Sequence, residues 1–253
     1  MNSPKPRTYW TRPETTGPEV FVAVPEGVTP PATVVVGMEL FGVTAWVRGV
    51  CEQLAAAGYA AVAPDFFGRT VPRADLPYDA AGRDEGFRLL SALTADQVAT
   101  DTAAALSVGA SLGAGPGRAF AGFSVGGHLA FVAGTRLPLD LIVACYPGWL
   151  LDADTTPFTA APQPPLTPTG AATLAAHGTT VLGLVGTDDH LVPPIDWSRI
   201  DARLTEAEVP HELVSYPDTP HGFLCPDRPA TFRPTESADA WSRILAALAT
   251  LKP

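Results

Sequence analysis

Short runs of apolar residues, mostly β-branched or alanine, recur along the chain and predict buried strands. They cover residues 20–24, 33–38, 60–63, 118–122, 141–145 and 180–185. Helical spacing of apolar positions covers residues 45–57, 96–112, 125–136 and 236–251. Gly58, Gly113 and Pro138 follow the first three of these segments, where helices are expected to stop. Strands alternating with helices predict an α/β fold, with a mostly parallel central sheet and helices on both faces.

The length of the chain predicts one folded unit. With 253 residues it can bury a full hydrophobic core, and α/β domains of this size commonly stay in one piece. No internal repeat of fixed period is present. We therefore expect a single domain over residues 1–253, with an irregular N-terminal segment over residues 1–18.

One stretch differs in composition from the rest of the chain. Between residues 155 and 170, five prolines oppose a regular helix or a central strand: Pro157, Pro162, Pro164, Pro165 and Pro168. We expect a loop over residues 152–170. It follows the strand that ends near Cys145, so it should leave the carboxyl edge of the sheet, where α/β folds bind ligands. The loop is expected to wall the site; a surface linker without substrate contact is the alternative.

The composition limits the classes of partner. Hydrophobic residues make up 46% of the chain, but no apolar run is long enough to span a bilayer. The formal net charge of −10, without a Lys/Arg cluster, argues against nucleic acid or anionic membranes as partners. No secretory signal pattern opens the sequence, and the widely spaced Cys51, Cys145 and Cys225 fit reduced thiols. We therefore expect a cytoplasmic protein without a metal or other cofactor, as a monomer or small homo-oligomer.

The strongest chemical signal is the string Gly122-Phe123-Ser124-Val125-Gly126, which stands between a predicted strand and a predicted helix. This is the pattern of a nucleophile elbow, in which a sharp turn lifts the serine hydroxyl into the crevice. The turn brings backbone segments so close that only glycines fit beside the serine. The amide of Val125, at the start of the helix, is expected to form half of an oxyanion hole. A chance G-x-S-x-G string is the alternative, which the strand and helix context disfavours.

Two further motifs predict a base and an acid for this serine. His221 lies in a loop after the apolar segment 212–216, and Asp188 and Asp189 follow the predicted strand 180–185. We favour Asp189 over Asp188 as the acid that orients the histidine. The order Ser124, Asp189, His221 is the order that the nucleophile-elbow fold imposes on its triad. The remaining histidines are expected to be structural or solvated: His128, His177, His190 and His211.

With these motifs, the chain from about residue 20 to its last helix resembles the dienelactone hydrolase family, the carboxymethylenebutenolidase-like branch of the α/β-hydrolases. The likeness is carried by the strings Met38-Glu39-Leu40-Phe41-Gly42-Val43, Ala63-Pro64-Asp65-Phe66-Phe67-Gly68-Arg69, Gly186 to Pro193, and His221 to Arg228 with Ala240-Trp241. The resemblance implies the α/β-hydrolase fold and an ester or lactone substrate. It also implies that Glu39 lies close to the nucleophile and that the Leu40 amide is the second oxyanion donor. A solvated loop carboxylate is the alternative for Glu39.

The chain also departs from the family pattern. Family members carry a cysteine in the elbow, whereas this chain has Ser124, either as its native nucleophile or as a replacement. The family's glutamate gates a thiol, and a serine hydroxyl is too weak an acid to persist as an anion, so this role does not transfer directly to Glu39. Arg83 matches one substrate-binding arginine of the family, but Cys225 stands where the other is expected. Arg228 could substitute, or the substrate is uncharged. Candidate substrate-binding residues are Phe41, Arg69, Arg83, Phe87, Trp149 and Arg228.

The sequence therefore predicts a serine hydrolase that cleaves an ester or lactone bond of a small molecule through an acyl-enzyme intermediate. A peptidase, thioesterase or acyltransferase could use the same triad. A non-catalytic small-molecule-binding protein is an alternative from another class. A metal-dependent hydrolase built on Asp188, His190 and Glu39 is a further one, although these residues lack a recognised ligand spacing.

Overall fold

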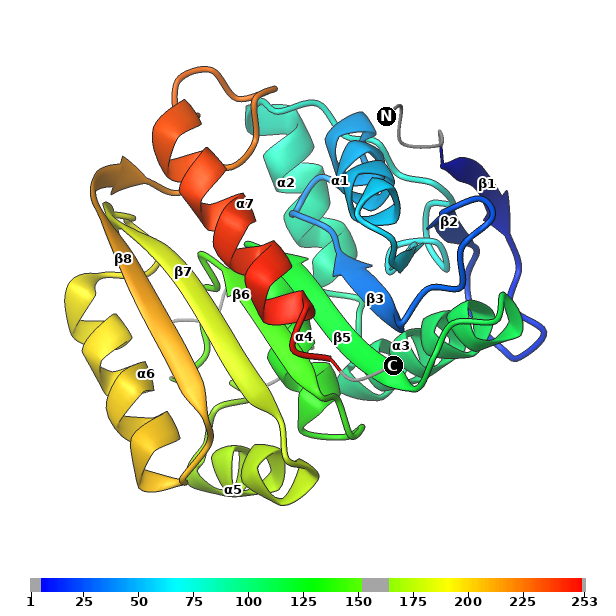
Figure 1. Cartoon of the computed structure of the whole chain (residues 1–253). Coiled ribbons are helices and arrows are strands. Elements are labelled where there is room, and N and C mark those ends of the chain that lie inside the picture. Colours follow the sequence, from blue (N-terminus) through cyan, green and yellow to red (C-terminus); the bar gives the residue numbers. More distant parts are fainter. Residues whose placement is uncertain (1–5, 152–163, 252–253) are drawn as a thin grey trace.

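The computed structural model describes residues 6–151 and 164–251. Within them it contains an eight-stranded sheet of strand order β1-β2-β4-β3-β5-β6-β7-β8 (Figure 1). The strands are β1 (Arg7–Thr11), β2 (Val20–Val24), β3 (Ala32–Gly37), β4 (Ala60–Pro64), β5 (Gly117–Phe123), β6 (Leu141–Cys145), β7 (Thr180–Asp188) and β8 (His211–Pro220). The six neighbouring strands β4, β3, β5, β6, β7 and β8 run parallel to one another. Strand β2 is antiparallel to both of its neighbours, β1 and β4.

Helices cover both faces of the sheet. They are α1 (Ala45–Ala56), α2 (Ala80–Leu90), α3 (Ala95–Ser111), α4 (Val125–Gly134), α5 (Pro168–His177), α6 (Pro194–Glu206) and α7 (Pro234–Leu248). Figure 1 shows α1 and α7 in front of the sheet and α3 and α4 behind it. Every residue of β2, β3, β4 and β6 is buried. Because helices shield both faces, these strands are continuous apolar runs rather than alternating ones.

The prediction of an α/β fold with a mostly parallel sheet and helices on both faces is confirmed. The parallel strands end at one edge of the sheet, and the loops after β3, β5, β6, β7 and β8 carry most of the polar residues singled out by the sequence. No helix in the described ranges is long and apolar enough to cross a bilayer.

Two expectations about irregular segments differ from the structure. Residues 1–18 are not wholly irregular, because Arg7–Thr11 forms the edge strand β1, whose Trp10 ring packs against Phe21 at 5.5 Å between centroids. The expected loop 152–170 ends earlier, because α5 begins at Pro168. Proline is compatible with the first position of a helix, and the Thr167 side chain caps this end by accepting a hydrogen bond from the Gly170 amide. The expectation for residues 152–163 lies outside the described residues.

Candidate active site

Ser124 stands at a sharp turn between β5 and α4. Its backbone has φ 55° and ψ −115°, a left-handed conformation that a serine rarely adopts. A Cβ atom at Gly122 would collide with the carbonyl of Gly126, and one at Gly126 would collide with the carbonyl of Gly37 in β3. The glycines on both sides of the serine are therefore required by close backbone packing.

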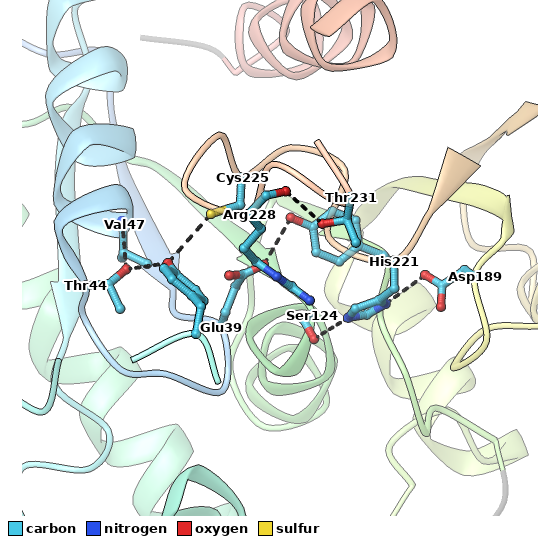
Figure 2. Close-up of polar contacts among 11 residues, drawn as sticks. Glu39, Thr44, Val47, Ser124, Asp189, His221, Cys225, Arg228 and Thr231 are labelled. Carbon is cyan, nitrogen blue, oxygen red and sulfur yellow. Dashed lines mark hydrogen bonds and ion pairs between the residues drawn. The ribbon is translucent and has the colours of Figure 1, made fainter. Parts of the chain in front are cut away.

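The serine, the histidine and the second aspartate of the motif lie in one chain of hydrogen bonds, shown in Figure 2. Ser124 Oγ is 2.8 Å from His221 Nε2, and His221 Nδ1 is 2.8 Å from Asp189 Oδ2. All three side chains are buried, whereas Asp188 is exposed at the end of β7. Because a carboxylate only accepts, Nδ1 carries the imidazole proton and Nε2 is left to accept from the serine hydroxyl.

Asp189 is held by the loop between β7 and α6. Its Oδ1 accepts hydrogen bonds from the amides of Leu191, at 2.8 Å, and Val192, at 3.2 Å. These amides and the imidazole leave little freedom to the carboxylate, which therefore fixes the orientation of His221.

The two backbone amides predicted as oxyanion donors follow neighbouring strands, Leu40 after β3 and Val125 after β5. Val125 is the first residue of α4, where the first amides of a helix have no acceptor within the helix. Leu40 follows β3, and α2 packs so closely on it that a Cβ atom at Gly86 would collide with the Leu40 carbonyl. Among the described residues, neither the Leu40 nor the Val125 amide has a hydrogen-bond acceptor. Both therefore can donate to a negatively charged oxygen.

Glu39 is almost fully buried beside the triad. Its Oε1 accepts a hydrogen bond from the Tyr146 hydroxyl at 3.4 Å and lies 3.7 Å from Arg228 Nη1, while Oε2 has no partner within the described residues. Burial raises the pKa of Glu39 to about 7, against the opposing effects of the Arg228 charge and the Tyr146 hydrogen bond. The side chain is therefore a carboxyl group that titrates near neutral pH.

Tyr146 contacts both Glu39 and His221 and is absent from the sequence-based candidates. It directly follows β6 with φ 42°, and its buried ring packs edge-on against the His221 ring with centroids 5.0 Å apart. Its strained backbone next to the nucleophile loop is typical of a functional position. The only sequence signal was its place at the carboxyl end of a predicted strand.

Arg228 crosses the loop that carries the histidine. A Cβ atom at Gly222, which has φ 78°, would collide with the Arg228 guanidinium. The guanidinium also lies 6.0 Å from the centre of the Phe41 ring. Cys225 stands at the position where the family arginine was expected, and its thiol donates a hydrogen bond to the Tyr78 hydroxyl at 3.6 Å. Of the candidate arginines, Arg228 is thus the one that the structure brings to Glu39.

Of the other candidate substrate-binding residues, the two arginines pair with carboxylates and the two aromatic residues pack against each other. Arg69 forms a bidentate ion pair with the buried Asp101 of α3 at 2.6 Å, and the exposed Arg83 pairs with Asp84. Among the described residues, neither arginine contacts the triad. Phe87 of α2 instead packs against Trp149 with ring centroids 6.3 Å apart.

The metal-dependent alternative finds no support in the grouping of ligands. Within residues 6–151 and 164–251, no three His, Cys, Asp or Glu side chains are close enough together to hold a metal ion. Cys51, Cys145 and Cys225 are free and buried.

The sheet is mostly parallel, and a strained turn with Ser124 follows β5. Asp189 follows β7 and His221 follows β8. This arrangement defines an α/β-hydrolase. The chain belongs to the dienelactone hydrolase family, whose model matches residues 19–252. This membership makes it a hydrolase that acts on ester bonds.

Individual relatives support the same membership. The chain is 29% identical over 231 residues to a Synechocystis protein named "Putative carboxymethylenebutenolidase", which covers 88% of each chain. It is 31% identical to the carboxymethylenebutenolidase of Pseudomonas putida over 119 residues, 46% of this chain and 50% of the relative. Among solved structures, the "Putative Dienelactone Hydrolase" of Klebsiella pneumoniae is similar with a TM-score of 0.82, at 27% identity over 97% of this chain and 99% of that one.

Proposed function

We propose that the chain is a serine hydrolase that cleaves an ester or lactone bond of a small molecule through an acyl-enzyme intermediate. The observation that carries the proposal is the pair of 2.8 Å contacts that link Ser124 Oγ to His221 and His221 to Asp189. Nucleophile, base and orienting acid within hydrogen-bond reach are the requirement for an activated serine. The free amides of Leu40 and Val125 support the proposal, because they can stabilise the oxyanion.

In the proposed mechanism, His221 Nε2 takes the proton of Ser124 as the hydroxyl oxygen attacks the carbonyl carbon. The tetrahedral oxyanion is held by the amides of Leu40 and Val125. The protonated His221 then gives its proton to the leaving alkoxide oxygen, and the acyl group stays on Ser124. Water then gives a proton to His221 and attacks the acyl carbon. The bond from that carbon to Ser124 Oγ breaks, the acid leaves, and His221 returns the proton to Ser124 Oγ.

Glu39 has a different role in this proposal from that of the glutamate in a thiol enzyme. A serine hydroxyl is activated by direct transfer of its proton to His221, so no second base is needed. Glu39 instead holds Arg228 beside the site across 3.7 Å. Arg228 and the Phe41 ring beneath it are proposed to contact the substrate, together with Phe87 and Trp149.

Hydrolysis by Ser124→Ala tests the proposal most simply. With a panel of carboxylic esters, thioesters and lactones, we expect the unsubstituted chain to prefer esters or lactones, and Ser124→Ala to lose about 10⁴- to 10⁶-fold in kcat. Ser107→Ala, on the exposed side of α3, is the matched control and should retain full activity. Undiminished activity of Ser124→Ala would overturn the mechanism, and a preference for thioesters would overturn the substrate class.

A further inference from the structure

A cavity of about 300 Å³ lies between residues 147–151, which follow β6, and the segment that joins β7 to α6 with the first turns of α6. It is lined by Pro147, Trp149, Leu150, Leu151, His190, Leu191, Val192, Pro193, Asp196 and Ile200. All but two of these side chains are apolar, and the described residues of the lining include no lysine or arginine. Its volume is at the lower end of the range for small-molecule sites, which are mostly apolar with a few polar groups.

Three residues of the cavity lining contact His221 or Asp189. The His190 ring packs edge-on against the His221 ring with centroids 5.8 Å apart. Leu191 and Val192, which face the cavity, are the residues whose amides hold Asp189. On the opposite side, Pro147 packs against the first turn of α4, where a Cβ atom at Gly127 would come within 2.9 Å of it. A group in the cavity therefore contacts the His190 ring, which packs on His221, and lies near the start of α4.

The histidine side of the site is where the alcohol part of an ester belongs. The leaving oxygen must take its proton from His221 Nε2, so the group attached to that oxygen extends past the imidazole. The Leu40 amide marks the other side, because β3, which Leu40 follows, lies on the opposite side of β5 from β6 and β7. His190 and Leu191 thus flank the path of the leaving group.

We infer that this cavity is the leaving-group subsite and that it takes a bulky apolar alcohol moiety, such as an arylmethyl group. The inference rests on the proposed function, because it needs an ester in the serine site. Among the described residues of this lining an anionic alcohol moiety would find no lysine or arginine, because Arg199, which pairs with Asp196 at 3.0 Å, is not one of them. Burial of an aromatic ring against the leucine and isoleucine side chains favours the larger alcohol.

The side chain of Ile200 offers a way to fill the cavity. It is buried on α6, and tryptophan there would occupy much of the available space. The matched control is Ile195→Trp, which places the same side chain on the same helix at a position that is 67% exposed and outside the cavity lining. Leu191→Trp, at a half-buried position of the lining, gives a second filling variant if Ile200→Trp does not fold.

The test compares kcat/KM for two pairs of esters. In the first pair the acyl group is fixed and the alcohol varies: methyl acetate and 2-naphthylmethyl acetate. In the second the alcohol is fixed and the acyl group varies: methyl acetate and methyl 2-naphthylacetate. We expect the unsubstituted chain to prefer the naphthylmethyl alcohol, and a filling variant to reduce this preference about 10-fold or more. The Ile195→Trp control should keep the preference.

Three other outcomes would overturn the inference, each for a different reason. An unchanged alcohol preference in a folded filling variant that still hydrolyses methyl acetate would overturn the subsite and leave the serine mechanism intact. Loss of preference in the acyl series instead would assign the cavity to the acyl group. If the unsubstituted chain hydrolysed none of the esters, the proposed function would fail, and the subsite with it.

Discussion

Asp189 and Glu39 are two buried carboxyl groups at the same edge of the sheet, but their surroundings differ. Asp189 accepts two backbone amide hydrogen bonds and lies 2.8 Å from the His221 imidazole. Glu39 accepts one long hydrogen bond from Tyr146, faces Arg228 across 3.7 Å, and leaves Oε2 without a partner in the described part of the chain.

The difference shows that the number of hydrogen-bond donors gives two buried carboxyl groups different properties. At Asp189 three hydrogen-bond donors, two amides and the imidazole, occupy both carboxyl oxygens. At Glu39 the donors are too few, so burial dominates and raises the pKa to about 7. Asp189 is therefore suited to a fixed orienting role, whereas Glu39 changes its protonation state near neutral pH.

Among substitutions of the two buried carboxyl groups and of Tyr146, Asp189→Asn is expected to have the largest effect on activity. An asparagine amide at this position offers a donor as well as an acceptor, so His221 can adopt the tautomer whose Nε2 carries a proton and cannot serve as a base. We expect kcat to fall about 10⁴-fold in steady-state hydrolysis of an accepted ester. The control Asp188→Asn alters the exposed neighbour and should retain activity. Equal losses of kcat in Asp189→Asn and Asp188→Asn would contradict the orienting role of Asp189.

Glu39→Gln is expected to change the pH dependence of stability. The pKa of Glu39 is raised from about 4.5 in the unfolded chain to about 7 in the fold, so the folded state binds the extra proton between these values. The stabilisation is full below about pH 4.5 and is lost as the pH rises through about 7. The loss amounts to about 3 kcal/mol at most. Relative to Glu39→Gln, the unsubstituted chain should therefore lose stability over this window.

Denaturant unfolding at a series of pH values measures this effect. The control is Glu26→Gln, which alters an exposed carboxylate that water surrounds in both folded and unfolded states. It should leave the slope of unfolding free energy against pH unchanged. If Glu39→Gln had the same slope as the unsubstituted chain, burial would not govern the charge of Glu39.

Tyr146→Phe should have the smallest effect of the three. The variant keeps the ring against His221 but removes the hydroxyl that donates to Glu39 Oε1. Because this hydrogen bond lowers the pKa of Glu39, its loss should raise that pKa further. We expect the unfolding free energy to fall by about 1 kcal/mol more at about pH 8.5 than at about pH 5. Tyr9→Phe, at the edge of the sheet, should show no such pH dependence.

Local features of the site could be predicted from the sequence. The elbow depends on glycines within two residues of Ser124, and their spacing is readable without knowledge of the fold. The acid and the histidine follow strands that are themselves visible as apolar runs. Once the strands were assigned to one parallel sheet, their carboxyl ends had to meet at a common edge.

Features that depend on distant partners were harder to predict. Tyr146 contacts Glu39 across 107 positions of sequence, and nothing in its local pattern marks this contact. Arg69 stands in a string shared with the family, but its guanidinium is engaged by Asp101 from another helix. Edge strand β1 has no fully buried residue and no run of aliphatic residues, so its sequence lacks the pattern of a buried strand. The start of α5 is hidden because Pro168 stands among other prolines.

Covalent labelling with a fluorophosphonate tests the central claim, that Ser124 is an activated nucleophile. The probe phosphonylates a serine only when its hydroxyl is activated by a neighbouring base. Intact mass followed by peptide mapping should show one phosphonyl group on Ser124, and no label on Ser124→Ala. An unlabelled Ser124 in a preparation that hydrolyses the ester panel would contradict the account.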